Sequence, residues 1–216
     1  MILYFVLFFP GIYSSGFASG LVKLTEIIPF DLFGELCRTF TYTIPAFALL
    51  WYVIPDNKGF SSLQKQKIKK EDLLPFAFGL PGLILIGLGI SFLISLLAEN
   101  QILTPPQKIE GPANVWAWVA VIISCIGTGY LEESYFRYYL LTKLESQLPA
   151  ATRRILLSSI LFSLCHVYEG PWGIINALLA GLLLSVLFIR YRSLHGIAWA
   201  HGGYNIFVYA MGPISS

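Results

Sequence analysis

The sequence is poor in charged residues. Asp, Glu, Lys and Arg together make up 12% of the 216 residues, whereas hydrophobic residues make up 56%. A soluble domain carries about 25% charged residues, because it must cover its surface with groups that water solvates. This shortage of charge excludes a soluble globular protein, and the chain is expected to lie in a lipid bilayer.

Cysteine is scarce as well, and neither charge sign is in large excess. Cys37, Cys125 and Cys165 are an odd number without the spacing of a disulfide framework or a zinc ribbon. We interpret them as small apolar side chains of the core. The formal net charge of +2 is too small to indicate a nucleic-acid partner.

Long apolar runs are abundant, at residues 2–21, 40–54, 73–98, 115–131, 155–167, 172–189 and 197–211. The longer runs are apolar on every face, which favours helices over the alternating pattern of a transmembrane barrel. We therefore predict an all-α fold, a polytopic transmembrane helical bundle of about seven spans. Runs 155–167 and 197–211 are shorter than the ~20 residues of a full span, which suggests helices packed inside the bundle beside a polar cavity.

Lys and Arg are distributed unevenly between the loops. If the spans alternate, only Lys23, Arg38 and Lys108 lie on one side. The other eleven lie on the opposite side: Lys58, Lys65, Lys67, Lys69, Lys70, Arg137, Lys143, Arg153, Arg154, Arg190 and Arg192. Because positively charged loops tend to stay in the cytoplasm, we predict a multi-pass protein of the plasma (inner) membrane with a cytoplasmic N-terminus and an external C-terminus.

Ionisable side chains inside such runs indicate a structural or functional role, since each costs at least ~2.5 kcal/mol at the centre of a membrane helix. Glu132 and Glu133 extend the run 115–131 without Gly or Pro, so the helix should continue through Arg137. Glu133 and Arg137 are four residues apart and should pair. Glu132 points about 100° away and stays free for general acid or base catalysis.

Two further spans carry histidine. His166 follows Phe162 by four residues, so both rings should share one helix face. His201 and Asn205 have the same spacing and present hydrogen-bond donors that can stabilise a developing oxyanion. With a rise of about 1.5 Å per residue, Glu132 and these three polar residues fall at similar depths and should line one buried cavity.

These residues form three motifs, in order, on three separate spans: Glu132-Glu133-x-x-x-Arg137, Phe162-x-x-x-His166 and His201-x-x-x-Asn205. The combination resembles the CAAX protease and bacteriocin-processing family (CPBP, or Abi family), which includes the type II CAAX prenyl endopeptidases. The resemblance covers about residue 115 to the C-terminus. We expect residues 1–216 to form a single membrane domain, with helices without a recognised motif in 1–112 and a CPBP-like catalytic core in 113–216.

The resemblance implies a glutamic intramembrane endopeptidase whose partners are the lipid bilayer and a membrane-associated protein or peptide substrate. It implies that Glu132 is the general base and activates a water together with His166. It also implies an oxyanion pair, His201 and Asn205, and structural support from Glu133, Arg137 and Phe162. Family members are regarded as metal-free, so no cofactor is implied, and bacterial relatives are associated with peptide maturation, bacteriocin self-immunity and processing of C-terminal sorting tails.

Other mechanisms compete with this interpretation. Glu132, His166 and His201 would also supply the ligands of a catalytic zinc, although no His-Glu-x-x-His helix is present. A cysteine mechanism is disfavoured, because Cys165 and its neighbour His166 point ~100° apart on a helix and cannot easily meet. A non-catalytic scaffold or a proton-coupled carrier could use the same intramembrane Glu and His residues. The His201/Asn205 donor pair favours the hydrolase, since a scaffold does not need it.

Overall fold

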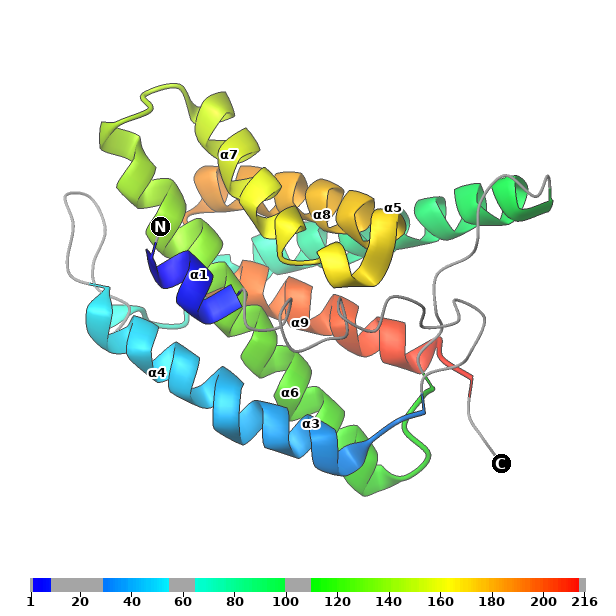
Figure 1. Cartoon of the computed structure of the whole chain (residues 1–216). Coiled ribbons are helices and arrows are strands. Elements are labelled where there is room, and N and C mark those ends of the chain that lie inside the picture. Colours follow the sequence, from blue (N-terminus) through cyan, green and yellow to red (C-terminus); the bar gives the residue numbers. More distant parts are fainter. Residues whose placement is uncertain (1, 9–28, 55–64, 100–109, 214–216) are drawn as a thin grey trace.

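The computed structural model describes residues 2–8, 29–54, 65–99 and 110–213, which form helices and turns and no β-strand (Figure 1). The helices are α1 (Ile2–Phe8), α3 (Leu32–Arg38), α4 (Ile44–Val53), α5 (Leu73–Glu99), α6 (Val115–Glu133), α7 (Ala151–Leu164), α8 (Gly170–Tyr191) and α9 (Leu194–Ala210). Shorter 3-10 or π-helical stretches are η2 (Thr39–Thr43), η4 (Lys70–Asp72), η5 (Ser134–Leu141), η6 (Leu144–Ser146) and η7 (Val167–Glu169). The predicted all-α bundle is confirmed.

Three helical stretches of the described residues are long and apolar enough to cross a membrane by themselves: Lys70–Leu97, Val115–Leu141 and Val167–Tyr191. Helices α7 and α9 are shorter, with 14 and 17 residues. At about 1.5 Å per residue, α7 is roughly 21 Å long, less than the ~30 Å hydrocarbon core. These are the two helices that the sequence predicts to be short.

Several boundaries differ from the predicted runs. The run 40–54 is the second part of a longer helical stretch, because α3 continues through η2 into α4. The run 115–131 extends through η5 to Leu141. Of the predicted first helix, residues 2–8 are described and residues 9–21 lie outside the described residues. Residues 55–64 and 100–109, in the connections before and after the run 73–98, also lie outside them.

The helices run back and forth between two ends of the molecule (Figure 1). The basic end holds the loops before α5, α7 and α9, where Arg154 and Arg192 lie 3.0 and 3.7 Å from Glu145. The opposite end holds the starts of α3, α6 and α8 and the end of α9, and here the Gly111 N–H donates to the Pro213 carbonyl. Successive described helices therefore run in alternating directions, as the order of the apolar runs predicts.

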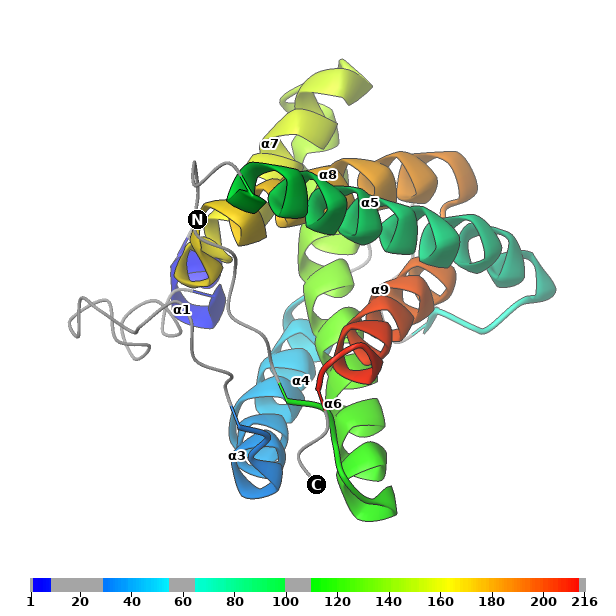
Figure 2. The same ribbon diagram turned by 90° about the vertical axis from the view of Figure 1, so that its right-hand side faces the viewer.

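Two parts of the N-terminal half pack against the C-terminal half: α5 packs against α8 and α9 (Figure 2), and the stretch from α3 to α4 packs against α6. At the basic end the Ser193 hydroxyl donates to Asp72 Oδ1 at 2.6 Å. The same hydroxyl oxygen caps α9 by accepting from the Gly196 N–H at 3.0 Å. Asp72, directly before α5, thus fixes the start of α9, the helix that carries the motif residues His201 and Asn205 further along.

Helices α6 and α9 approach each other closely because glycines lie where they meet. A Cβ atom on Gly129 would lie 2.7 Å from the Ala198 carbonyl oxygen, and one on Gly202 would lie 3.0 Å from the Cys125 carbonyl oxygen. Small residues at helix contacts of this kind let main chains touch in membrane proteins. Main-chain contact therefore sets the spacing between α6 and α9.

The orientation of the bundle is open to direct measurement. Because Lys-rich and Arg-rich loops stay in the cytoplasm, we predict that the basic end faces the cytoplasm and the C-terminus lies outside. A reporter active only in the cytoplasm should give a signal when fused at Lys65 and none when fused at Ser216. Equal signals from the two fusions would contradict the alternation on which the prediction depends.

Candidate active site

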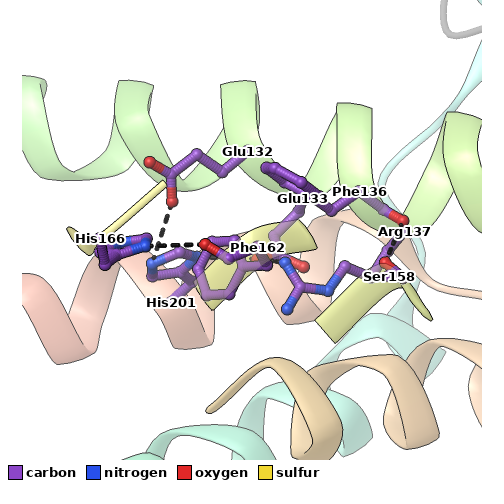
Figure 3. A network of polar contacts seen from close by, with 8 residues as sticks. All are labelled: Glu132, Glu133, Phe136, Arg137, Ser158, Phe162, His166 and His201. Atoms are coloured by element: carbon purple, nitrogen blue, oxygen red, sulfur yellow. Dashed lines mark hydrogen bonds and ion pairs between the residues drawn. The ribbon is translucent and has the colours of Figure 1, made fainter. Parts of the chain in front are cut away.

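The motif residues come from four elements that meet inside the bundle. Glu132 and Glu133 end α6, and Arg137 follows in η5. Phe162 lies in the last turn of α7, and His201 lies near the middle of α9. Figure 3 shows their side chains converging between α6, α7 and α9.

Glu133 is the buried centre of this cluster, with no exposed side-chain surface. Its Oε1 accepts from Arg137 Nη1 at 2.9 Å and from His201 Nδ1 at 2.8 Å. The predicted pair with Arg137 is confirmed, whereas the bond to His201 was not predicted. Since a carboxylate oxygen accepts and cannot donate, Nδ1 of His201 carries the hydrogen and Nε2 points to the other side of the ring.

Glu132 lies on that other side of the His201 ring. Its Oε2 is 3.6 Å from His201 Nε2, and its side chain is 16% exposed. With Arg137 as the one permanent cation, two ionised carboxylates would leave a net negative charge inside the bundle. One added proton, on either Oε2 or Nε2, would make the group neutral, which is the less costly state in a membrane interior.

His166 lies just beyond the end of α7, where the sequence predicts it to be on the helix. The helix ends at Leu164 and His166 begins the turn into η7, with φ −103° and ψ 15°. The predicted contact with Phe162 is still present, with ring centroids 4.7 Å apart. His166 Nδ1 donates to the Phe162 carbonyl oxygen at 3.0 Å, so Nε2 of the neutral ring is left as a proton acceptor.

Phe162 joins the separate parts of the site. Its side chain is 1% exposed, and its ring also contacts the His201 ring at 5.8 Å between centroids. The Arg137 guanidinium lies 4.4 Å from the centre of the same ring, within the range of a cation–π interaction. The Phe162 ring thus contacts both imidazoles and the guanidinium.

Asn205 follows His201 by one turn of α9, about 6 Å along the helix. Its side chain is half-buried. The structure therefore keeps it on the predicted face of α9. No hydrogen bond of its carboxamide to another described residue is formed, which leaves its donors open to a substrate.

The zinc alternative can be compared with this geometry. Among the described residues, no group of three His, Cys, Asp or Glu side chains is arranged to hold a metal ion. Both ring nitrogens of His201 face carboxylates, Nδ1 toward Glu133 and Nε2 toward Glu132. The three candidate zinc ligands are thus not gathered around one point.

A cleft of about 280 Å³ lies at the opposite end of the bundle, lined by Pro29, Phe30, Asp31, Gly34, Glu35, Arg38 and Tyr209. Glu35 accepts hydrogen bonds from Arg38 at 2.7 Å, Ser124 at 2.8 Å and Tyr209 at 2.7 Å. Burial raises the pKa of the Glu35 carboxyl, but Arg38 and these bonds lower it more, so its pKa lies below the ordinary value.

This cleft is separate from the motif residues. Ser124 precedes Glu132, and Tyr209 follows His201, by two helical turns, or about 12 Å. The cluster at the cleft was missed from the sequence because residues 1–112 carry no recognised motif. The Glu35-x-x-Arg38 spacing, which pairs opposite charges on one helix face, is the signal that could have indicated it.

Comparison with known families identifies the segment that carries the site. Residues 114–207 match the family model described as type II CAAX prenyl endopeptidase Rce1-like. The matched segment spans α6 to α9 and includes every residue of the three motifs. Comparisons with curated proteins and with solved structures gave no match.

Proposed function

Because residues 114–207 match the type II CAAX prenyl endopeptidase Rce1-like family model, we propose that the chain is a glutamic intramembrane endopeptidase. Its substrate is a membrane-associated protein or peptide, cleaved within or next to the lipid bilayer. The observation that carries the proposal is the convergence of two glutamates from α6 on one histidine of α9, with Glu133 2.8 Å from Nδ1 and Glu132 3.6 Å from Nε2 of His201. No cofactor is needed for the chemistry that follows.

Water activation is assigned to Glu132 and His166. A water between them donates one hydrogen bond to the Glu132 carboxylate and one to Nε2 of His166, the acceptor that the Phe162 carbonyl leaves free. Its oxygen attacks the carbonyl carbon of the scissile peptide bond as the proton moves to Glu132.

Oxyanion stabilisation is assigned to His201 and Asn205. The bond from His201 Nδ1 to Glu133 fixes the orientation of the ring, so the hydrogen on Nε2 points into the reaction centre. The Asn205 carboxamide supplies a second donor one turn further along α9. Collapse of the tetrahedral intermediate breaks the C–N bond, and Glu132 returns its proton to the leaving amine.

The proposed activity can be tested in cells that carry either the wild-type protein or Glu132→Gln. Peptide termini of the membrane fraction are compared by mass spectrometry. We expect a set of proteins that lose a segment only in cells with the wild-type chain. Identical termini in both cells would instead support a scaffold or a proton-coupled carrier that uses the same Glu and His residues.

Metal dependence gives a second, independent prediction. Because Glu132 and His166 polarise the water by themselves, protein stripped with a strong chelator should keep its turnover. His201→Ala should lower turnover about 10²–10³-fold, the usual effect of losing one oxyanion donor, while the fold stays intact.

The measurement is the cleavage rate before and after chelation, together with the zinc content per chain. A zinc enzyme would lose activity on chelation, regain it on addition of metal, and release the ion in His201→Ala. Stoichiometric zinc combined with chelator-sensitive cleavage would refute the glutamic mechanism.

A further inference from the structure

Helix α1 is short and apolar, and one of its faces is buried while Phe5 and Val6 on the other are exposed. Tyr4 is 2% exposed, and Leu7 and Phe8 are also buried. The helix lies next to the C-terminal part of α7 in both views of the molecule (Figures 1 and 2). Its burial is therefore provided by contacts with the helices that carry the motifs.

Aromatic side chains of η5 form the base of this contact. The Tyr4 ring lies 6.4 Å from Tyr135 and 6.2 Å from Phe136, measured between centroids. The Phe8 ring lies 5.0 Å from Tyr135 and 4.8 Å from Phe136. Aromatic pairs favour offset-stacked or edge-to-face packing, and these four pairs are one stacked, one edge-to-face and two tilted.

Two hydroxyl groups fasten α1 on either side of this base. The Tyr4 hydroxyl donates to the Leu161 carbonyl on α7 at 2.8 Å and accepts from Cys165 Sγ at 3.4 Å. On the other side, the Tyr42 hydroxyl of η2 donates to the Leu7 carbonyl of α1. Helix α1 thus bridges η2 and α7, and we call the residues that hold it the α1-binding surface: Tyr42, Tyr135, Phe136, Leu161 and Cys165.

The α1-binding surface adjoins the catalytic residues. The Phe136 ring lies 5.2 Å from Phe162, whose ring contacts both His166 and His201. Phe136 also follows Glu132 by one helical turn, about 6 Å along the axis. A segment bound on this surface would therefore lie about one helical turn from Glu132.

We propose that the α1-binding surface is where the apolar, helical membrane segment of a substrate binds, and that α1 occupies this place until a substrate displaces it. This inference rests on the proposed peptidase function. The contacts of α1 define the partner: an apolar helix with an aromatic residue that stacks on Tyr135 and Phe136. Tyr42 donates to a main-chain carbonyl of whichever helix is bound, so its bond does not depend on the sequence of the occupant.

Two matched substitutions separate this role from a structural one. In Tyr4→Phe the lost hydroxyl belongs to α1, so α1 binds less well while the substrate is unaffected. In Tyr209→Phe the lost hydroxyl donates to Glu35 in the separate cleft, so the binding of neither occupant is affected. Each change removes one tyrosine hydroxyl, and the loss of one net hydrogen bond shifts an equilibrium by about fivefold.

For a substrate with an apolar membrane segment, kcat/KM should rise about fivefold in Tyr4→Phe and stay near the wild-type value in Tyr209→Phe. A short peptide with the same scissile bond but no apolar segment should be cleaved equally by all three proteins. Unchanged kcat/KM in Tyr4→Phe, or the same rise for both substrates, would overturn the proposal.

A second measurement does not depend on activity. Cys165 contacts Tyr4, whereas Cys125 is buried elsewhere and serves as an internal reference. Reaction with a membrane-permeant maleimide should be about fivefold faster at Cys165 in Tyr4→Phe and in Tyr42→Phe, which each lose one hydroxyl that holds α1, and unchanged at Cys125. Unchanged labelling of Cys165, or equal acceleration at both cysteines, would show that α1 does not leave its surface. If the wild-type protein cleaves nothing, the proposed function fails, and labelling still decides whether α1 is displaceable.

Discussion

Replacing Glu132 by Gln is expected to lower turnover by about 10²–10⁴-fold, the contribution of a general acid–base group, without unfolding the protein. The carboxamide has the size of the carboxyl group but cannot take a proton from water. The Glu132 side chain is partly exposed, and its partner is His201 Nε2 at 3.6 Å, so no buried cation loses its charge partner. Cleavage of a membrane-embedded substrate and the melting temperature are the two measurements.

Glu145→Gln is a suitable control for Glu132→Gln. Glu145 is a half-exposed carboxylate at the basic end, 3.0 Å from Arg154 and distant from the motif residues. Its replacement should leave turnover near the wild-type value. If Glu132→Gln kept most of its turnover, another group would have to accept the proton and the assignment of Glu132 would be wrong.

Replacing Glu133 by Gln is expected to destabilise the protein by about 3–5 kcal/mol, the cost of removing one partner from a buried ion pair. Arg137 has no exposed side-chain surface and would keep its positive charge inside the bundle. The same change removes the acceptor of His201 Nδ1, so the remaining folded protein should also turn over more slowly. Melting temperature, yield and turnover per folded molecule report these effects.

The double substitution Glu133→Gln with Arg137→Gln separates stability from positioning. Removing both charges eliminates the unpaired cation, so part of the lost stability should return. Activity should stay low, because His201 still lacks its carboxylate acceptor. Full recovery of activity in the double variant would mean that Glu133 acts only as the counter-ion of Arg137. Equal stability and equal activity loss for Glu132→Gln and Glu133→Gln would contradict the division of roles between the two glutamates.

The parts of the site that sequence analysis predicts correctly are contacts within one helix. The Glu133–Arg137 pair and the Phe162–His166 contact follow from residues four apart, because helical geometry fixes such neighbours. The bond between Glu133 and His201 joins α6 to α9 across 68 positions of the chain. Spacing within a helix says nothing about which face of a distant helix lies opposite, so this contact could not be predicted.

Other differences arise where the sequence gives no local signal. Helix α7 ends at Leu164, although the nearest helix-breaking residues, Gly170 and Pro171, come later. The π-helical stretch η5 follows Glu133 without Gly or Pro. Stretches of this kind are often found at functional sites, and their extra residue per turn comes from tertiary packing. In residues 1–112, packing of α1 against η5 depends on aromatic contacts that no motif marks.

The glycine contact between α6 and α9 has a consequence for motion at the site. Glu132 follows Gly129 by about one turn, and His201 directly precedes Gly202. Main-chain atoms in contact cannot relax by changing rotamer, so the Cα atoms of Glu132 and His201 separate only when whole helices move. Helix displacements occur over microseconds to milliseconds, whereas exposed side chains reorient within picoseconds to nanoseconds. The spacing between α6 and α9 is therefore unaffected by fast side-chain motion and changes only with the slow, collective rearrangements of the bundle.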